Sequence, residues 1–585
     1  MRLPISLGLV SALALMVGGA NAIAEDHGRD RDHDFRTATP IKHLVVIFDE
    51  NRSFDHYFGT YPNALNPEGE PIFEPARHTP RDVNNLLSDP TLLTNNPNLN
   101  PANGTGASNP FRLDRTQANT ADQSHNYTRE QQADDNGKLD LFPLDVGRGT
   151  KGGAGAFGTT GQVMGYFDGN TVTGLWNYAQ HFAMSDNAFT DTFGPSTPGL
   201  LNMYAGQTNG ATFPIVPAAI ASAPDLGAAL LAAGVAVPDG QGGLTLIQDI
   251  DPVGDVCSSP TFQVQMTGKN TGDLLNAANI PWGSFVGGFN LQTANANGTT
   301  GCLRSSFNPV TGGSPKDYIP HHIWFQYFAS TANPTHARPT SVQAIGHSKV
   351  PGTQTPDPAN HGYDLDDFFT AVKAGNFPSV SYIKASAFQD GHPGNSDPLS
   401  EQQGLVSLLN FLQQQPDWKN TAVIFTYDDS DGQYDHVPTK ITSASFSGAD
   451  AFNGPGVCGV GVNEPNGVKG LPVAGRCGPG NRIPFLVISP FAKRNFVSHT
   501  LITQASVARF IEDNWLHGER LGGGSFDATA GSIMDMFDFD RDREDGVPKL
   551  ILDPAAGTVV SASGFRDDDR DHHHDRDHDR DHDRH

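Results

Sequence analysis

Two stretches of the chain each combine an apolar run with polar side chains that could bind a metal ion. Residues 41–61 read IKHLVVIFDENRSFDHYFGTY, and residues 421–437 read TAVIFTYDDSDGQYDHV. The apolar, β-branched runs predict buried strands, and in parallel sheets ligands bind at the carboxyl ends of the strands. Carboxylate and amide oxygens favour one hard divalent cation, Ca²⁺, Mg²⁺ or Mn²⁺, over Zn²⁺ or iron. The predicted metal ligands are Glu50, Asn51, Asp428 and Asp429.

Acidic residues at strand ends also have a purely structural use, because they cap loops and helices. For one isolated pair this structural interpretation would be preferred. Here two pairs follow near-identical apolar runs, which favours the metal site.

A candidate nucleophile lies in the segment GPSTPG, residues 194–199. Pro195 fixes the approach of the chain, and Pro198 suits the first turn of a helix, so Ser196 is predicted near a helix N-terminus, where backbone N–H groups favour anions. A serine hydroxyl beside a divalent ion deprotonates readily and can attack phosphorus. Taken alone, the same segment is also typical of an ordinary turn followed by a helix cap.

Histidines in polar, loop-like segments supply a third component. They could bind phosphoryl oxygens or protonate a leaving group, although a lone histidine is more often a hydrogen-bonded structural residue. The adjacent pair is the hardest to explain structurally. The candidates are His125, His321, His322, His392 and His436.

The rest of the chain alternates segments typical of strands and of helices, which predicts an α/β fold with a mainly parallel sheet between helices. The predicted strands are residues 44–48, 380–383, 422–427 and 483–488. The predicted helices are residues 405–412 and 505–515. Three segments lack this pattern: residues 63–119 and 439–481 are predicted to be irregular, and residues 210–320 to form an inserted cap lobe beside the sheet.

The charge balance excludes some partners. The 585 residues include 38 Lys and Arg against 64 Asp and Glu, a formal net charge of -26. Such a chain is not expected to bind nucleic acid or an anionic membrane surface. An anionic substrate would have to be received by local positive charge, such as a metal ion.

The first residues predict export. Residues 1–24 carry Arg2, an apolar run over residues 5–17 and a small-residue cleavage site, the pattern of a signal peptide. The run is too short for a membrane anchor, and no later segment of the sequence is long and apolar enough to span a bilayer. The mature protein is therefore predicted to be periplasmic or secreted.

The four cysteines fit an exported protein. They allow three disulfide connectivities, and sequential pairing, Cys257 with Cys302 and Cys458 with Cys477, is preferred because it closes two local loops. A zinc site is the rival interpretation, and the absence of any C-x-x-C spacing argues against it.

Two charged segments frame the predicted catalytic domain, residues 40–560. Residues 25–39 are a charged linker, and residues 566–585, RDDDRDHHHDRDHDRDHDRH, form a tail of Asp, His and Arg. Neither can bury an apolar face, so both are predicted to be solvated and disordered. A tail that scavenges divalent metal is the alternative.

Seven motifs together resemble one bacterial phosphoesterase family, which contains phosphatidylcholine-hydrolysing phospholipases C and respiratory-burst-inhibiting acid phosphatases. The motifs are VIFDENRSFDHYFGTYP, DQSHNYTREQQADDNGKLDLF, TDTFGPSTPGLLNMYAGQ, HHIWFQYF, HPGNSDPLSEQQG, TYDDSDGQYDHVP and RIPFLVISPFAKRNFVSHT. The resemblance covers most of residues 41–515. It implies a fold similar to that of alkaline phosphatase, with a central sheet between helical layers.

The resemblance also implies roles for the candidate residues. Glu50, Asn51, Asp428 and Asp429 would hold the metal, and Ser196 would become phosphoserine. The phosphoryl pocket would be lined by His125, His321, His322 and His392. Many phospholipases of the family carry Thr in place of Ser196 and Glu in place of Asp429, so this chain resembles the acid phosphatase branch. Asp49 stands where Gln is common.

The sequence thus predicts an exported, metal-dependent acid phosphatase that hydrolyses phosphomonoesters of broad specificity through a phosphoserine. The first alternative is a phospholipase C that cleaves phosphocholine-type diesters. The second is a secreted metal- or phosphate-binding protein whose active element is the tail. The expected partners are phosphate-ester small molecules or phospholipid head groups.

Overall fold

The computed structural model describes residues 36–540 and 546–565. The predicted signal peptide, most of the predicted linker and the predicted tail lie outside these residues. Within the described ranges, no helix has the length and apolar character needed to cross a bilayer.

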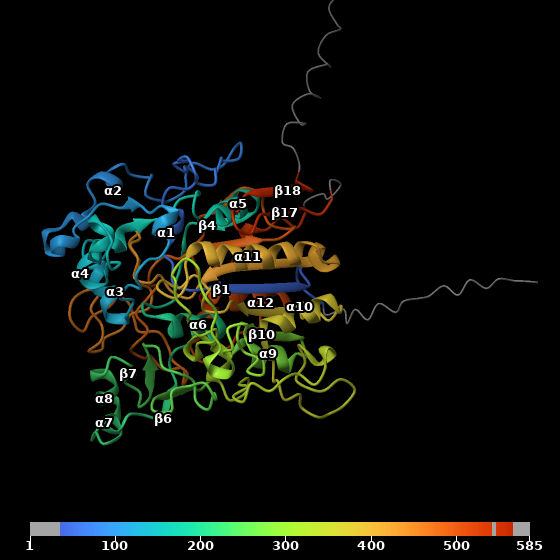
Figure 1. The fold of residues 1–585 in the computed structure, drawn as a ribbon. Coiled ribbons are helices and arrows are strands. Elements are labelled where there is room, and N and C mark those ends of the chain that lie inside the picture. The colour runs from blue at the N-terminus through green and yellow to red at the C-terminus, as the bar shows by residue number, and fades with distance from the viewer. Residues whose placement is uncertain (1–35, 541–545, 566–585) are drawn as a thin grey trace, which may run out of the picture. The chain divides into compact units, whose positions relative to one another are not determined.

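An eight-stranded sheet forms the centre of the protein (Figure 1), in the order β11-β10-β12-β1-β13-β14-β4-β15. Strand β1 (His43–Asp49) lies between β12 (Val380–Lys384) and β13 (Thr421–Tyr427) and is parallel to both. All but one of their residues are buried, which explains why these strands read as continuous apolar runs. Strand β14 (Phe485–Ile488) is antiparallel to its two neighbours. The predicted mainly parallel sheet is confirmed.

Helices cover both faces of the sheet, as predicted. In Figure 1, α11 (Pro398–Gln413) lies on one side of β1 and α12 (Ala505–Trp515) on the other. Helix α5 (Thr173–His181) packs beside α11, and α6 (Ser196–Ala205) packs beside α12. At the start of α11, the Asp397 side chain accepts from two backbone N–H groups of the first turn.

The remaining elements are shorter or lie at the edges. The other strands of the central sheet are β4 (Ala183–Ser185), β10 (Trp282–Val286), β11 (Gly362–Asp364) and β15 (Phe496–Ser498). Small two-stranded pairs are formed by β2 (Phe111–Arg112) with β3 (Gly165–Tyr166), β5 (Ala188–Phe189) with β16 (Ile502–Thr503), and β17 (Lys549–Leu552) with β18 (Val559–Ser563). Further helices are α1 (Phe54–Phe58), α3 (Tyr127–Asp134), α4 (Phe142–Asp145), α9 (Thr271–Ala277) and α10 (Leu365–Lys373).

The predicted cap lobe over residues 210–320 is not confirmed as one inserted unit. Its first part forms small sheets, β6 (Ala211–Ile215) with β9 (Gln263–Met266) and β7 (Ala236–Pro238) with β8 (Leu244–Leu246), and two short helices, α7 (Ala218–Ala221) and α8 (Leu226–Ala232). Its later part contributes β10 to the central sheet. The run WGSFV that forms β10 is short and includes Gly and Ser, so its apolar signal is weak.

The cysteines pair as predicted, Cys257 with Cys302 and Cys458 with Cys477. Both predicted irregular segments are also confirmed. Residues 63–119 contain only short pieces such as α2 (Thr91–Thr94). Residues 439–481 are described throughout and hold turns, bends and isolated bridges only.

Candidate functional site

Strands β1 and β13 bring the two predicted ligand pairs to one edge of the sheet. They are parallel neighbours in which Asp49 is opposite Tyr427, so the residues that follow them emerge side by side. The backbone N–H of Asp428 donates to the carbonyl of Asp49 over 3.2 Å. Asn51 has a φ of +61°, which Asn adopts more readily than most residues. Its side chain therefore turns back toward the end of β13.

Helix α6 presents the predicted nucleophile at its first residue. Pro195, just before the helix, is extended, and Ser196 is 1% exposed. The helix approaches the end of β13 very closely. A Cβ atom on Gly199 would lie only 1.8 Å from the carbonyl oxygen of Asp428. Glycine is required at this contact, and it seats Ser196 against the carboxylates.

The Ser196 hydroxyl points directly at the predicted metal ligands. Its Oγ lies 3.0 Å from Glu50 Oε2, 3.2 Å from Asp429 Oδ2 and 3.4 Å from Asn51 Oδ1. One hydroxyl proton cannot serve three acceptors. The hydroxyl oxygen instead lies among the side-chain oxygens of Glu50, Asn51 and Asp429. We call these residues, together with Asp428, the carboxylate ring.

The charges of the ring are compatible with a bound divalent cation. Burial and the charge of Glu50 raise the pKa of Asp428 well above its ordinary value, and burial does the same for Asp429. The Oδ2 atom of Asp428 is buried and has no hydrogen-bond partner among the described residues. The Asn51 amide can donate its N–H groups to Asp428 and Glu50, or turn its oxygen toward them, an orientation that a cation would stabilise. At this edge the structure also brings together Glu50, His322 and His392, whose ligand atoms all lie within 4.8 Å of one another and could hold a metal ion. The four predicted ligands stay a prediction.

The four histidines assigned by the resemblance form a row beside this ring. The ring centroids of His125 and His392 are 6.4 Å apart, those of His392 and His322 are 5.9 Å apart, and those of His322 and His321 are 4.5 Å apart. His322 also contacts the carboxylate ring, since its Nδ1 lies 3.0 Å from Glu50 Oε1. His436 lies elsewhere and pairs with Asp55 over 2.6 Å.

The histidines at the ends of this row and those in its middle have pKa values shifted in opposite directions. Burial would lower the pKa of His125, but Asp429 and Asp431 outweigh it and raise that pKa well above the ordinary value. His321, beside Asp251 at 3.3 Å, also has a raised pKa. Burial lowers the pKa of His322 to about 4 and lowers that of His392. The pKa values are thus raised at the two ends of the row and lowered in its middle.

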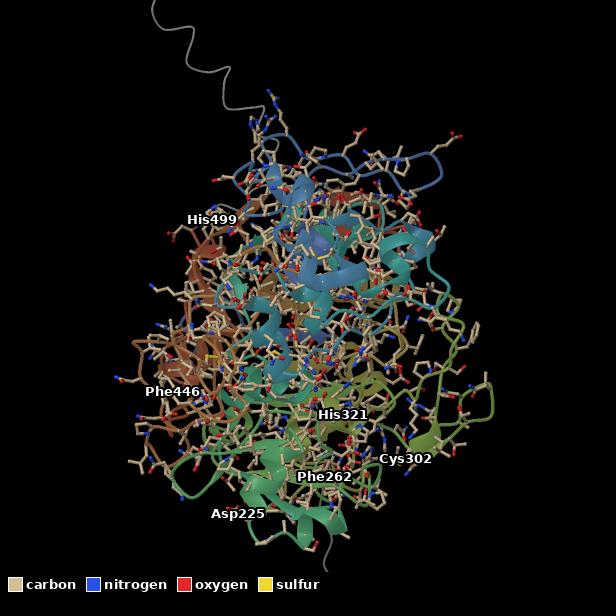
Figure 2. All side chains as sticks on the ribbon, turned by 90° about the vertical axis from the view of Figure 1, so that its left-hand side faces the viewer. Asp225, Phe262, Cys302, His321, Phe446 and His499 are labelled. Carbon is tan, nitrogen blue, oxygen red and sulfur yellow. A yellow bond between two sulfur atoms is a disulfide. The ribbon has the colours of Figure 1, made fainter. Side chains whose placement is uncertain are left out.

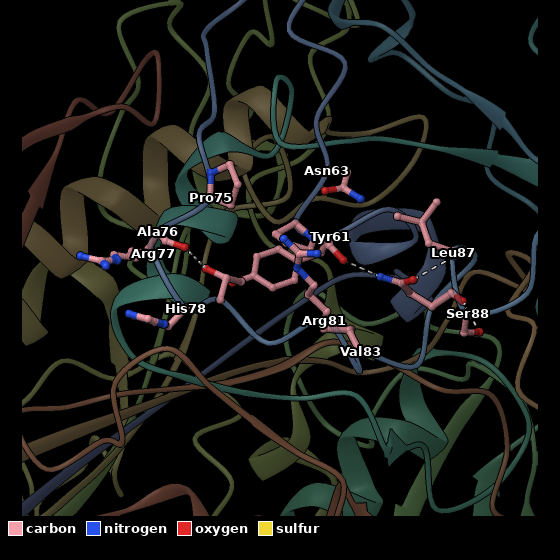
Figure 3. Close-up of a pocket in the computed structure, with 13 residues that line it drawn as sticks. Tyr61, Asn63, Pro75, Ala76, Arg77, His78, Arg81, Val83, Leu87 and Ser88 are labelled. Carbon is pink, nitrogen blue, oxygen red and sulfur yellow. Dashed lines mark hydrogen bonds between the residues drawn. The ribbon is translucent and has the colours of Figure 1, made fainter. Parts of the chain in front are cut away.

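A separate surface cavity of about 790 Å³ lies on the irregular segment that follows α1 (Figure 3). Tyr61 and Val83 line it, together with the basic residues Arg77, His78 and Arg81. None of the predicted site residues is among its lining residues. The cavity is therefore distinct from the carboxylate ring.

Comparison with known proteins explains this constellation. The model of the Phosphoesterase family matches residues 41–516. The chain belongs to the Phosphoesterase family. The family resemblance read from the seven motifs is thereby confirmed.

The relatives of this phosphoesterase carry related names. A non-hemolytic phospholipase C of Pseudomonas aeruginosa is 25% identical over 539 residues, which cover 89% of this chain and 60% of that protein. Phospholipase C B of Mycobacterium tuberculosis is 22% identical over 570 residues, which cover 90% of this chain and 85% of that protein. Non-specific phospholipase C1 of Arabidopsis thaliana is 29% identical over 148 residues, 24% of each chain. The chain thus spans less than two thirds of the Pseudomonas relative.

Lys384 of this phosphoesterase is a site residue that the sequence did not reveal. It is the last residue of β12, it is 2% exposed, and its Nζ contacts Glu50 Oε1. Its ammonium also lies 5.3 Å from the centre of the Phe48 ring. Together with His322 it holds the pKa of Glu50 well below the ordinary value, although burial alone would raise it. The only sequence signal was a lysine ending the apolar run VSYI.

Replacing Lys384 with methionine is expected to destabilise the metal-free phosphoesterase and to strengthen its metal binding. The substitution leaves Glu50 buried without its cation, a loss of about 3–5 kcal/mol in the free energy of unfolding. It also removes a positive charge that repels a bound cation. In chelator, the unfolding temperature of the variant should therefore be lower than that of the wild type. On addition of Mn²⁺, the unfolding temperature of the variant should rise more than that of the wild type. Lys373→Met, at an exposed position, is the control, and an unchanged unfolding temperature in chelator would contradict the pairing.

The metal-free phosphoesterase is also expected to lose stability as the pH rises from about 6.5 to 8. Burial raises the pKa of Glu130, Asp134, Glu401 and Asp431 to about 7. Up to this pH, the folded state therefore binds more protons than the unfolded state. The contribution of these protons to the free energy of unfolding is lost as the pH rises through about 7. Below about pH 6.5 the buried neutral histidines oppose the trend. Calorimetry at pH 6.5 and pH 8 in chelator should show the drop, and Glu401→Gln should make it smaller.

Proposed function

We propose that this protein is a metal-dependent hydrolase of phosphoric esters that acts as a phospholipase C on phosphocholine-type diesters. The family membership supports the hydrolase, and the names of the relatives favour the phospholipase C alternative over the acid phosphatase that the sequence predicted. The observation that carries the proposal is the Ser196 hydroxyl, 3.0 Å from Glu50 and 3.2 Å from Asp429 at the start of α6.

In the proposed reaction, Ser196 Oγ attacks phosphorus and gives its proton to a carboxylate of the ring. The bond from phosphorus to the diacylglycerol oxygen breaks, and the head group stays on Ser196 as a phosphodiester. Water then attacks phosphorus, breaks the bond to Ser196 and releases the phosphorylated head group. A divalent ion held by Glu50, Asn51, Asp428 and Asp429 would lower the pKa of the hydroxyl and neutralise charge on the phosphoryl oxygens.

The histidine row would serve the phosphoryl group and the leaving oxygen. His125 is the better general acid, because the carboxylates around it keep its imidazole protonated. His392 has a lowered pKa and suits an acceptor or a hydrogen-bonding position. His321 and His322 would line the opposite end of the phosphoryl pocket.

Two chromogenic substrates test the proposal. p-Nitrophenyl phosphorylcholine is a diester and p-nitrophenyl phosphate a monoester, and both release the same product. A phospholipase C should have the larger kcat/KM for the diester. A clear preference for the monoester would return the assignment to the acid phosphatase of the sequence prediction, and activity on neither would favour the binding protein.

Export to the periplasm or the medium, predicted from residues 1–24, belongs to the same proposal. Its test is the N-terminal sequence of the mature protein, which should begin near residue 25.

A further inference from the structure

Three strongly exposed apolar side chains lie on two segments that a disulfide ties together. Val256, Leu303 and Phe307 expose 58%, 67% and 61% of their surfaces. The Cys257–Cys302 disulfide joins the neighbours of the first two. Figure 2 shows Cys302 on the same face of the molecule as His321. We call Val256, Leu303 and Phe307 the rim patch.

The segments of the rim patch are anchored at His321 and at the segment that contains His392. On one side, Asp251 lies 3.3 Å from His321 and accepts a hydrogen bond from the backbone N–H of Ser259 over 2.7 Å. This contact fixes the stretch that contains Val256. The stretch that contains Val256 is thereby held close to His321.

The other anchor is Asn308, which directly follows Phe307 and is fully buried. It donates to the carbonyl of Phe388 over 2.9 Å and to Asp397 Oδ2 over 2.8 Å. These two residues bracket His392 in the sequence. The rim patch therefore lies between the segments that carry His321 and His392.

The segments that carry the rim patch contain few charged residues, and the exposed Lys316, which lies opposite Ser305, borders them. The chain has a net charge of -26, yet residues 256–268, 274–303 and 305–315 contain no Asp, Glu, Lys or Arg. Arg304, between the last two, is buried and paired with Asp317 at 3.1 Å. Single exposed apolar residues are ordinary on protein surfaces. Three of them on segments that a disulfide joins, that carry few charges and that contact His321 and the segment of His392, match a neutral amphiphilic surface.

We propose that the rim patch docks onto the surface of a zwitterionic phospholipid layer and carries the site to the head groups. This inference rests on the proposed function. The three apolar side chains enter the boundary between head groups and acyl chains, where burial of apolar surface stabilises binding. The uncharged segments around them meet head groups of zero net charge without repulsion. A soluble substrate reaches Ser196 without this contact.

The test compares the triple variant Val256→Ser, Leu303→Ser, Phe307→Ser with the wild type on two substrates. Hydrolysis of phosphatidylcholine vesicles should fall about tenfold or more, and hydrolysis of soluble p-nitrophenyl phosphorylcholine should stay unchanged. The control variant is Val559→Ser, Val560→Ser, on the exposed strand β18, which lies away from the carboxyl end of β1 (Figure 1). It should alter neither rate. An equal loss on both substrates would overturn the proposal.

Vesicle binding separates this proposal from the proposed function. Protein carrying Ser196→Ala should sediment with phosphatidylcholine vesicles more than with anionic phosphatidylglycerol vesicles, and adding the triple substitution should abolish this. If the wild type cleaves the soluble diester while Ser196→Ala protein stays in the supernatant, the docking is wrong and the function stands. If binding depends on the rim patch while no diester is cleaved, the docking stands and the function is wrong. Stronger binding to the anionic vesicles would overturn the docking.

Discussion

Replacing Ser196 with alanine is expected to lower phosphoester hydrolysis by a factor on the order of 10⁴ or more. The substitution removes a hydroxyl that lies within 3.4 Å of three predicted metal ligands. The fold and the metal content should survive, because the change removes one oxygen atom from a buried position and leaves every carboxylate in place. Initial rates on p-nitrophenyl phosphorylcholine, with metal content measured by mass spectrometry, give the result.

The matched variant is Ser196→Thr, which keeps the hydroxyl and adds one methyl group. It should retain measurable activity, because the reacting oxygen stays at the start of α6. Acid quenching during turnover should trap a covalent adduct on Ser196 in the wild type and none in Ser196→Ala. A folded Ser196→Ala protein with ordinary activity would show that the nucleophile lies elsewhere.

Removing a ligand charge is expected to have opposite effects on stability with and without the ion. Burial and Glu50 raise the pKa of Asp428, so its ionised form disfavours folding at pH 7 unless a cation compensates it. Asp428→Asn should therefore unfold at the same or a higher temperature than the wild type in chelator. In excess divalent ion it should lack most of the stabilisation by the ion, which is about 2.7 kcal/mol at a hundredfold excess over Kd. Activity should fall with the loss of the ion.

Asp435→Asn provides the contrast for this experiment. Asp435 is equally buried, but it is paired with Arg482 at 3.1 Å, away from the predicted ligands. Its loss removes one of the two carboxylates that pair with the buried Arg482 guanidinium, the other being Asp55. The unfolding temperature should therefore be lower both with and without the ion. If Asp428→Asn behaves like Asp435→Asn in chelator, the carboxylate ring is not the cation site.

The strands that carry the site were predictable because burial on both faces makes them continuous apolar runs. Residues 44–48, 380–383 and 422–427 each fall inside an observed strand. Strand β10 was missed because WGSFV is short and its neighbours are rich in Gly and Asn. Its place beside β12 depends on pairing with residues about a hundred positions away, which no local pattern encodes.

The candidate site was predictable where a motif joins chemistry to a strand end, as in Glu50 and Asp428. Lys384 was not, because an isolated lysine becomes part of the site only when β12 lies next to β1. The choice between a phosphomonoester and a phosphodiester substrate could not be predicted from the sequence pattern either. Ser196 and Asp429 resemble the acid phosphatases, whereas the relatives are named phospholipases C.

The central position of β1 sets the order in which the site can be assembled during synthesis. It is the first strand of the described chain, and its partners β12 and β13 are made more than three hundred residues later. A growing chain therefore already contains Glu50 and Ser196 while Asp428 and Asp429 have yet to be added. Because strand pairing over such separations is slow, Ser196 and the four predicted metal ligands come together only in a nearly finished chain. The proposed activity is consequently expected only after most of the chain has been made.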